Sequence, residues 1–370
     1  MLARAYRAAE RGRGTVSPNP LVGCVVARGG EVVAEGHHER AGGPHAEVVA
    51  LDAAGEAARG SDVFVTLEPC NHHGRTPPCV DRLLEAGVAA VTIGMPDPNP
   101  EVTGRGADAL AAAGVRVAWA EDPAPFESLN EAWLHRIRTG RPFVRVKVAL
   151  TLDGKPSLAV GCRTRITGPG GAAVTRRLRA GATAVAVGSN TVAVDDPHLT
   201  VRDDTGLAAA RQPRRIVLAR TALPDTASAM FADGLGRVTL VVSDVAPPSD
   251  AVRVRDAGLR VLVYAASGGL EGALRALAAD GIDDVLIETG PSLFTALWAE
   301  GFVDELIVVT AGGMAGLDGP DAFTGSADGA ADALQPRFVP VEAGIVEGDA
   351  VTVWRPRDAV SPARGKGSGA

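Results

Sequence analysis

One histidine and two cysteines in the first third of the chain fall where expected strands and helices meet. His45 and Cys79 each begin a helical pattern, and Cys70 follows an apolar run over residues 62–67 that is typical of a strand. Imidazole and thiolate groups are ligands for zinc, and three protein ligands leave the fourth tetrahedral position open. A fold in which these residues share one metal ion must bring two successive strand-to-helix turns together.

Glu47 lies two residues after the histidine, at the start of the same expected helix. Unpaired amides and the helix dipole favour a hydroxide or another anion there. The order His-x-Glu, Pro-Cys and a second cysteine is typical of zinc deaminases, in which the glutamate transfers protons and does not bind the metal. A structural zinc site, with His72 or His73 as fourth ligand, is the alternative.

The length of 370 residues favours two domains. Strand and helix patterns alternate over residues 1–140, which predicts a layered α/β domain with helices over a sheet. Within it, the apolar runs 21–26 and 31–34 are expected to pair as a hairpin, and residues 126–138 to form one helix. The Gly/Pro-containing residues 139–142 mark the predicted boundary.

Residues 141–355 are predicted to form a second α/β domain. A β-branched strand pattern starts this domain, and short apolar runs separated by helical stretches follow it. These strand patterns cover residues 143–150, 184–188, 215–218, 238–242, 259–263, 284–287 and 305–309. Residues 356–370 are rich in Pro, Gly, Ser and Arg and are predicted to be a disordered tail.

The composition excludes several classes of protein. With 37 basic and 44 acidic residues and a net charge of -7, the chain has no general basic field for nucleic-acid phosphates. No apolar run reaches the roughly eighteen residues that a membrane-spanning helix needs, so no membrane partner is expected. Four cysteines, two of them assigned to the metal site, do not make a disulfide framework. A reducing cytoplasm is therefore the expected compartment.

Four motifs around the candidate metal site resemble the deaminase half of the bifunctional deaminase-reductase of riboflavin biosynthesis. They are Pro18-Asn19-Pro20-x-Val22-Gly23, Pro44-His45-Ala46-Glu47, Thr66-Leu67-Glu68-Pro69-Cys70 and His72-His73-Gly74-Arg75-Thr76-Pro77-Pro78-Cys79. The resemblance implies a cytidine-deaminase-like three-layer domain. In it His45, Cys70 and Cys79 hold Zn²⁺, and Glu47 is the catalytic proton donor.

The same resemblance implies the substrate of this half. It is a small molecule, 2,5-diamino-6-(5-phosphoribosylamino)pyrimidin-4-one, which is hydrolysed at its 2-amino group. Asn19, His72, His73 and Arg75 would line the pyrimidine and ribose-phosphate pocket.

Motifs of the second domain resemble the reductase half of that family, and the resemblance continues to about residue 355. They include Lys147-x-Ala149-x-Thr151-Leu152-Asp153-Gly154-Lys155, Asp195-Asp196-Pro197-x-Leu199-Thr200-x-Arg202 and Glu288-Thr289-Gly290-Pro291-Ser292-Leu293. The reductase half has a dihydrofolate-reductase-like fold and uses NADPH to reduce the ribosyl group to ribityl. The G-x-G-x-x-G fingerprint of the Rossmann fold does not occur in the chain.

Matching position by position assigns contacts in the second domain. The implied cofactor contacts are Ala149, Thr191, Asp195, Gly290, Pro291 and Ser292. The implied substrate contacts are Arg179, Leu199, Arg202 and Glu288, with the arginines gripping the phosphate through bidentate bonds. The proton source is Lys147 or Lys155, between which the sequence does not choose.

Several positions depart from the reductase pattern. Arg163 and Arg165 stand where the family has a serine and a tryptophan, Arg220 replaces a serine, and Gly312 replaces a proline. The two arginines at 163 and 165 would bind the 2'-phosphate of NADPH or fill the pocket. These replacements motivate an alternative function, an active deaminase whose reductase half is degenerate or serves a specialised pathway.

The main hypothesis remains the enzyme with both activities, acting as a homo-oligomer, either a dimer or a tetramer. A nucleic-acid deaminase or a structural-zinc module is the third hypothesis. It lacks a basic face, and only 4% of residues are aromatic, which is few for stacking on bases.

Overall fold

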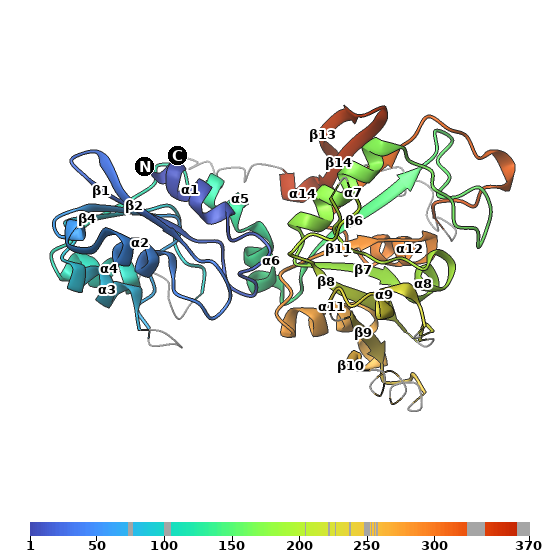
Figure 1. The fold of residues 1–370 in the computed structure, drawn as a ribbon, viewed down its shortest axis with the longest axis horizontal. Helices are drawn as coiled ribbons and strands as arrows, with labels where there is room; N and C mark the ends of the chain where they lie inside the picture. Colours follow the sequence, from blue (N-terminus) through green and yellow to red (C-terminus); the bar gives the residue numbers. More distant parts are fainter. Residues whose placement is uncertain are drawn as a thin grey trace, which may run out of the picture. The chain divides into compact units, whose positions relative to one another are not determined.

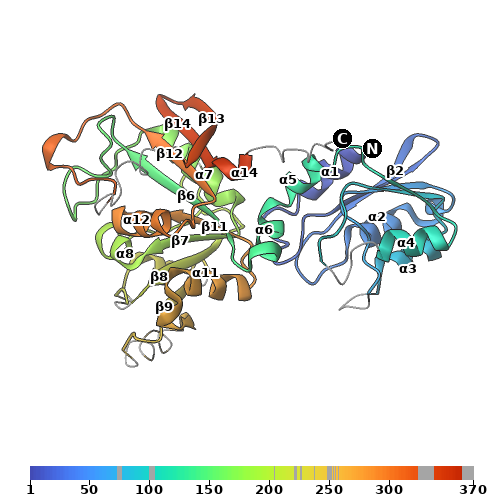
Figure 2. The same cartoon turned by 180° about the vertical axis from the view of Figure 1, so that it is seen from behind.

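The computed structural model describes residues 1–72, 77–99, 105–203, 205–220, 223–225, 227–236, 238–247, 252, 254, 256, 258–323 and 337–360. The chain divides into two compact units, shown in Figure 1 and from behind in Figure 2. The first is Met1–Arg141 with Gly281–Asp283, and the second is Pro142–Asp280 with Asp284–Ala370. No helix of the described residues has the length and apolar character needed to cross a membrane.

A five-stranded sheet in the order β2-β1-β3-β4-β5 forms the centre of the first unit. β1 pairs antiparallel with β2 and with β3, whereas β3, β4 and β5 run parallel. Its strands are β1 (Gly23–Arg28), β2 (Glu31–His37), β3 (Asp62–Val65), β4 (Ala90–Ile93) and β5 (Arg116–Trp119). The predicted hairpin is therefore present, although β1 begins and ends two residues later than predicted and β2 runs three residues past its predicted end.

Helices cover both faces of this sheet, with α2, α3 and α4 on one face and α1 and α5 on the other (Figure 1). Two apolar cores result, one around Leu51, Leu83 and Leu110 and one around Phe126 and Trp133. The helices are α1 (Leu2–Glu10), α2 (Ala46–Ala54), α3 (Cys79–Ala86), α4 (Arg105–Ala112), α5 (Ala124–Leu129) and α6 (Glu131–Thr139), with a 3-10 turn at Gly55–Ala58. The unit has the three-layer α/β architecture expected from the sequence.

One close approach fixes the start of α2. A Cβ atom built on Gly36 of β2 would lie 2.5 Å from the Ala46 carbonyl oxygen and 2.5 Å from the Ala50 nitrogen. Only glycine therefore allows the first turn of α2 to lie this close to the sheet. That turn carries His45 and Glu47 at its beginning.

The single helix predicted over residues 126–138 is wrong, because the structure has two helices, α5 and α6, that break at Asn130. The Asn130 side chain is buried and pairs with the backbone of Leu21, accepting from its nitrogen at 2.7 Å and donating to its oxygen at 3.0 Å. This tertiary contact accompanies a non-helical backbone at Asn130, with φ of -105°. The apolar periodicity continues through the break and so does not reveal it.

The second unit contains a nine-stranded sheet in the order β10-β9-β8-β7-β11-β6-β12-β14-β13. The strands from β10 to β12 run parallel, and β14 and β13 add an antiparallel hairpin at one edge. The strands are β6 (Phe143–Leu150), β7 (Ala184–Gly188), β8 (Arg214–Ala219), β9 (Val238–Ser243), β10 (Arg260–Tyr264), β11 (Asp284–Glu288), β12 (Glu305–Thr310), β13 (Phe338–Val346) and β14 (Asp349–Pro356).

The parallel part of this sheet places the ends of several strands at one edge, where ligands bind in open α/β folds. α7, α8 and α9 pack on the apolar residues of one sheet face. The helices are α7 (Pro169–Gly181), α8 (Ser189–Asp195), α9 (Ala229–Ala232), α11 (Gly269–Ala279), α12 (Pro291–Ala299) and α14 (Arg357–Val360), with 3-10 turns at Ala266–Gly268 and Gly316–Asp318.

The sequence patterns did not reveal the β13–β14 hairpin. Most residues of β13 are exposed, so its sequence lacks the apolar run on which strand prediction depends. The predicted tail, 356–370, overlaps the end of β14 and the short helix α14. Its residues 361–370 lie outside the described part of the chain.

Candidate active sites

The structure brings His45, Cys70 and Cys79 together in the first unit, with their ligand atoms within 4.8 Å of one another. The His45 Nδ1 atom lies 3.1 Å from the Cys79 Sγ atom and 3.6 Å from the Cys70 Sγ atom. His45 precedes α2, Cys70 follows β3, and Cys79 begins α3, as the sequence predicts. Three ligands from two successive connections, β2–α2 and β3–α3, fit one zinc ion with an open fourth position.

Local interactions prepare this cluster for a metal ion. The Cys79 backbone nitrogen donates to the Cys70 sulfur at 3.4 Å. Hydrogen bonds from the Cys79 and His45 side chains lower the pKa of Cys70 well below that of a free thiol. Because the thiolate is the form that binds metal, the donor set has the chemistry that zinc requires.

Glu47 is buried, with 3% of its surface exposed, in the first turn of α2. Burial raises the pKa of its carboxyl group, and the positive charge of His45 opposes that rise. A raised pKa lets a carboxyl group both accept and return a proton close to neutral pH. This property fits the acid-base role predicted for Glu47.

A cavity of about 240 Å³ adjoins Glu47, His45 and Cys70. Two predicted substrate contacts, Asn19 and His72, line it. The other two, His73 and Arg75, lie outside the described residues.

Four residues that the sequence reasoning missed also line this cavity: His38, Asp97, Asn99 and Trp133. The proline-rich turn after β4 was a usable signal for Asp97 and Asn99. His38 and Trp133 had no comparable signal, because they reach the cavity only through the fold.

His38 fixes the orientation of Asn19. Its Nδ1 atom lies 2.8 Å from the Pro44 carbonyl oxygen, which can only accept, so Nδ1 carries the proton. The His38 Nε2 atom then accepts from the Asn19 side-chain nitrogen at 2.9 Å. Burial lowers the pKa of His38, which favours the neutral ring that this pattern needs.

Asp97 adds another buried carboxyl group to the cavity, which Glu47 and Glu68 also line. Burial raises its pKa to about 6, and the negative charges of Glu68 and Cys70 act in the same direction. One of its oxygens accepts from the Asn99 backbone nitrogen at 2.9 Å. The cavity therefore holds two carboxyl groups, from Glu47 and Asp97, with raised pKa values.

In the second unit, Arg179 and Glu288 form a bidentate ion pair. The Arg179 Nε and Nη2 atoms donate to the two carboxylate oxygens at 2.6 and 2.9 Å, and Nη1 donates to the Thr200 carbonyl oxygen at 3.0 Å. Most of the guanidinium group that was expected to grip phosphate is thus engaged within the protein.

Lys147 is the strand neighbour of Glu288, because β6 and β11 pair in a register that places them side by side. Loss of hydration on burial lowers the pKa of Lys147, and the negative charge of Glu288 opposes the shift. Lys155 lies on the loop after β6 and forms an ion pair with Asp321 at 2.7 Å. Of the two lysines considered from the sequence, Lys147 is the one beside the predicted substrate residues.

The predicted cofactor residues fall on neighbouring turns. Thr191 and Asp195 are on α8, and Gly290, Pro291 and Ser292 form the turn into α12. A Cβ atom built on Gly290 would lie 3.7 Å from the Thr191 hydroxyl oxygen, so these two turns are adjacent. Ala149, near the end of β6, pairs with Val309 of β12.

A buried polar atom just after the end of β11 supports a cofactor site. The Thr289 hydroxyl is buried and has no hydrogen-bond partner among the described residues. It adjoins the glycine turn that leads into α12. Because buried hydroxyl groups are normally hydrogen-bonded, the turn fits a polar group such as part of NADPH.

The arginines that replace family residues are exposed. Burial raises the pKa of Asp195, and the positive charge of Arg163 opposes this shift, which places a cation near a predicted cofactor contact. Arg220 follows β8, and its charge acts on Tyr264 of β10. Within the described residues, no contact of Arg165 distinguishes between its two predicted roles.

Comparison with known proteins identifies both units. Residues 1–95 match the zinc-binding region of cytidine and deoxycytidylate deaminases, and residues 142–343 match the RibD C-terminal domain. The fold and the His/Cys/Cys cluster thus define a zinc-dependent deaminase joined to a reductase domain.

The relatives give the particular family. The riboflavin biosynthesis protein RibD of Escherichia coli is 42% identical over 337 residues, which cover 86% of this chain and 88% of that protein. Its counterpart in Aquifex aeolicus is 38% identical over 308 residues, or 83% and 85% of the two chains. The chain belongs to the RibD family of riboflavin biosynthesis.

Solved structures agree over nearly the whole chain. A structure of Acinetobacter baumannii RibD has a TM-score of 0.86 and 35% identity, covering 96% of this chain and 97% of that one. A Thermotoga maritima protein described as a diaminohydroxyphosphoribosylaminopyrimidine deaminase/5-amino-6-(5-phosphoribosylamino)uracil reductase has a TM-score of 0.80 and 32% identity, with 96% and 97% coverage.

Several predictions from the sequence are thereby confirmed. The chain is an enzyme with a cytidine-deaminase-like domain and the reductase domain of this family. It is a zinc-dependent deaminase and an NADPH-dependent reductase of riboflavin biosynthesis that acts on a small molecule. The comparisons support this function and not the alternative of a lost or retargeted reductase.

Proposed function

We propose that the first unit hydrolyses the 2-amino group of 2,5-diamino-6-(5-phosphoribosylamino)pyrimidin-4-one and that the second unit reduces the ribosyl group of the product to ribityl. The observation that carries the first step is the convergence of His45, Cys70 and Cys79 beside the cavity that Glu47 lines. The adjoining Lys147, Glu288 and Arg179 carry the second.

For the deaminase step, His45, Cys70 and Cys79 would hold the zinc ion, which would supply a water whose pKa is lowered towards about 7. Glu47 takes the proton of this water, delivers it to the ring nitrogen, and helps to protonate the leaving amine. Asn19, held by His38, offers its side-chain oxygen to an N–H group of the pyrimidine. Trp133, which lines the same cavity, offers an aromatic surface to the ring.

For the reductase step, NADPH supplies the hydride. Lys147 supplies the proton to the sugar oxygen or nitrogen, since its lowered pKa favours release of a proton and it adjoins Glu288. Arg179 holds the Glu288 carboxylate in place through both nitrogen atoms of its fork.

Arg202 is the better phosphate ligand. Its Nε atom donates to the Thr200 hydroxyl at 3.2 Å and its Nη1 atom to the Gly206 carbonyl at 2.9 Å. Its Nη2 atom makes no hydrogen bond within the described part of the chain, so we assign the substrate phosphate to it. Thr191, Asp195 and the turn from Gly290 to Ser292 are assigned to NADPH, together with Ala149.

A single-turnover assay tests this proposal. Zinc-loaded protein mixed with the substrate and NADPH should release ammonia first and oxidise NADPH afterwards, and mass spectrometry should find the deaminated and then the reduced product. Ammonia release without NADPH oxidation would contradict the second step. Zinc-loaded protein that releases no ammonia would contradict the first.

Two further features are part of the proposal. We infer a homo-oligomer, a dimer or a tetramer, because the edge strand β13 exposes Val341 and Ile345, at 44% and 73%. Light scattering after gel filtration would contradict this inference by finding a monomer. The inferred cytoplasmic location rests on cysteine usage, and none of the four cysteines, all of which lie in the described residues, forms a disulfide.

A further inference from the structure

The segment 196–202 contains Leu199 and Arg202, the residues assigned to the reductase substrate, and its backbone is strained. Leu199 has φ of +54° and Asp196 has φ of +41°, in the left-handed region that side chains other than glycine rarely adopt. Leu199 is also buried, with 1% of its surface exposed. Such strain persists only where surrounding contacts force the conformation, and it gathers at functional sites.

Two arginines hold the carbonyl groups on either side of Leu199. Arg215 Nη1 donates to the His198 carbonyl oxygen at 3.2 Å, and Arg179 Nη1 donates to the Thr200 carbonyl oxygen at 3.0 Å. The peptide group before Leu199 and the peptide group after Thr200 are therefore fixed by two different arginines. Arg179 belongs to the assigned substrate site, whereas Arg215 lies on β8, outside it.

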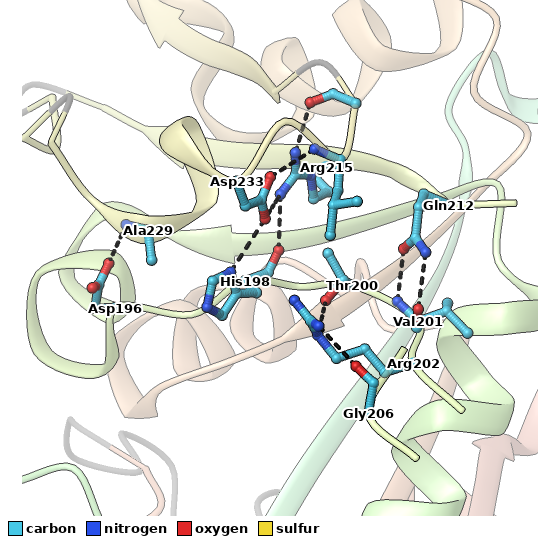
Figure 3. Close-up of polar contacts among 12 residues, drawn as sticks. Asp196, His198, Thr200, Val201, Arg202, Gly206, Gln212, Arg215, Ala229 and Asp233 are labelled. Atoms are coloured by element: carbon cyan, nitrogen blue, oxygen red, sulfur yellow. Dashed lines mark hydrogen bonds and ion pairs between the residues drawn. The ribbon is translucent and has the colours of Figure 1, made fainter. Parts of the chain in front are cut away.

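The side chain of His198 is held by the same cluster, as Figure 3 shows. Its Nδ1 atom lies 3.2 Å from the Asp233 carboxylate oxygen that also accepts from Arg215 Nη1 at 2.7 Å. Arg215 and Asp233 thus grip His198 through both its carbonyl oxygen and its ring. We call Arg215 and Asp233 the His198 clamp.

Other contacts hold the ends of the segment. The Asp196 carboxylate accepts from the Ala229 backbone nitrogen at 2.7 Å. The Gln212 side chain bonds both backbone groups of Val201, accepting at 2.7 Å and donating at 2.9 Å (Figure 3). The ends are therefore fixed without Arg215, so the clamp acts on the middle of the segment, where Leu199 lies.

Stability alone does not explain Arg215. Its side chain is 1% exposed, and its Nε atom has no hydrogen-bond partner among the described residues. Replacing a buried ion pair by apolar residues is often neutral or stabilising, and an unpaired buried N–H group costs free energy. A buried pair with this defect is better explained by the conformation that it imposes on its neighbours.

We propose that Arg215, with Asp233, is a positioning residue for the reductase substrate. The clamp fixes the His198–Leu199 peptide group, keeps the buried Leu199 in its left-handed conformation, and so sets where Arg202 meets the ribose phosphate. The proposal rests on the reductase function assigned above. It adds a residue that touches neither substrate nor cofactor.

Arg215→Lys tests the clamp and has a matched control. Lysine keeps the charge beside Asp233, but its single ammonium group cannot reproduce the planar fork that also reaches the carbonyls of His198 and Gly236. The control is Arg214→Lys, the same substitution at the next residue of β8, where the side chain pairs with Asp280. Asp233→Asn weakens the clamp from its other side and is the second test variant.

The assay supplies the deaminated substrate and NADPH and follows NADPH oxidation. Loss of one hydrogen bond from a charged donor is worth roughly tenfold in an equilibrium constant, so we expect KM for the pyrimidine ribose phosphate to rise about tenfold in Arg215→Lys and Asp233→Asn. The kcat should change by less than about threefold, because the reacting groups remain in place. Ammonia release by the first unit calibrates the amount of enzyme, and a kcat for NADPH oxidation near that of wild type shows that the second unit of each variant is folded.

Hydrogen exchange gives a readout that does not depend on turnover. The Val201 amide is protected by Gln212, and amides of residues 196–202 should exchange faster in Arg215→Lys than in wild type and Arg214→Lys. Unchanged KM in both clamp variants, or an equal rise of KM in Arg214→Lys, would overturn the proposal. A wild-type protein that never oxidises NADPH would instead overturn the assigned reductase function, and the exchange measurement would still decide whether the clamp holds the segment.

Discussion

Gly36→Ala is expected to damage the deaminase from outside its cavity. The new methyl group would lie 2.5 Å from both the Ala46 carbonyl oxygen and the Ala50 nitrogen. Ordinary contacts between heavy atoms lie near 3.5–4.0 Å, so the first turn of α2 must move away from β2 by about 1 Å. His45 and Glu47 flank Ala46 and must move with it.

The expected magnitude has two parts. Overpacking a well-packed interior costs about 1–3 kcal/mol of unfolding free energy. A misplacement of about 1 Å in a catalytic group costs roughly 100-fold in rate. Ammonia release should therefore fall by about two orders of magnitude even in protein that remains folded, and zinc affinity should fall because one of three ligands has moved.

The measurements are kcat for ammonia release, bound zinc by atomic emission, and the thermal midpoint. Gly344→Ala is the matched control, since Gly344 is also a strand glycine but has open space around its Cβ position. NADPH oxidation with the deaminated substrate should be unchanged in both variants. A Gly36→Ala protein with full zinc content and kcat within about threefold of wild type would refute the argument that this close approach places the catalytic turn.

Four further predictions address the sites. Glu47→Gln should keep zinc while ammonia release falls by about 10²–10⁴, and loss of zinc would contradict the assigned role. The Cys70→Ser protein should contain less bound zinc than wild type, as measured by atomic emission. A full zinc content would contradict the assignment of Cys70 as a ligand. Lys147→Met should lower reductase kcat by about 10²–10⁴-fold with ammonia release unchanged. Lys155→Met should leave reductase kcat near that of wild type. Equal losses of kcat in the two variants would contradict the assignment of Lys147 as the proton donor. Asp97 has a folded-state pKa of about 6, raised by burial above the unfolded value of 3.8, so the folded state binds more protons and stability falls as pH rises from about 4 to 6. Asp97→Asn should remove this loss of stability, so its free energy of unfolding at pH 8, measured by urea unfolding, should exceed that of wild type by on the order of 1–3 kcal/mol. The same dependence of stability on pH in the variant and in wild type would contradict this prediction.

Patterns near in sequence predicted much of the first unit. The helix expected to begin at Cys79 is α3, Cys79–Ala86, because a local apolar period and a proline before its first residue both mark its start. The break at Asn130 escaped prediction because its cause, the pairing with Leu21, joins residues far apart in the chain. The exposed strand β13 escaped for a different reason, since it has no buried face that an apolar pattern could report.

The candidate sites divide in the same way. Local motifs pointed to His45, Glu47, Cys70 and Cys79, because metal ligands must be particular residue types at turns. His38 and Trp133 reach the cavity through the fold and have no motif of their own. The structure also engages Arg179 with Glu288, which the sequence reasoning had assigned separately to substrate.

What the sequence by itself determined is the chemistry that the chain carries: the metal-binding residue types, the glutamate beside them, and the family of both halves. Only the tertiary structure decided which of Lys147 and Lys155 adjoins Glu288, and which buried arginine holds the segment around Leu199. The physical reason is how far apart along the chain the interacting residues lie. Residue types and turns are local properties of the chain, whereas burial, strand register and hydrogen bonding between distant segments exist only once the chain has folded.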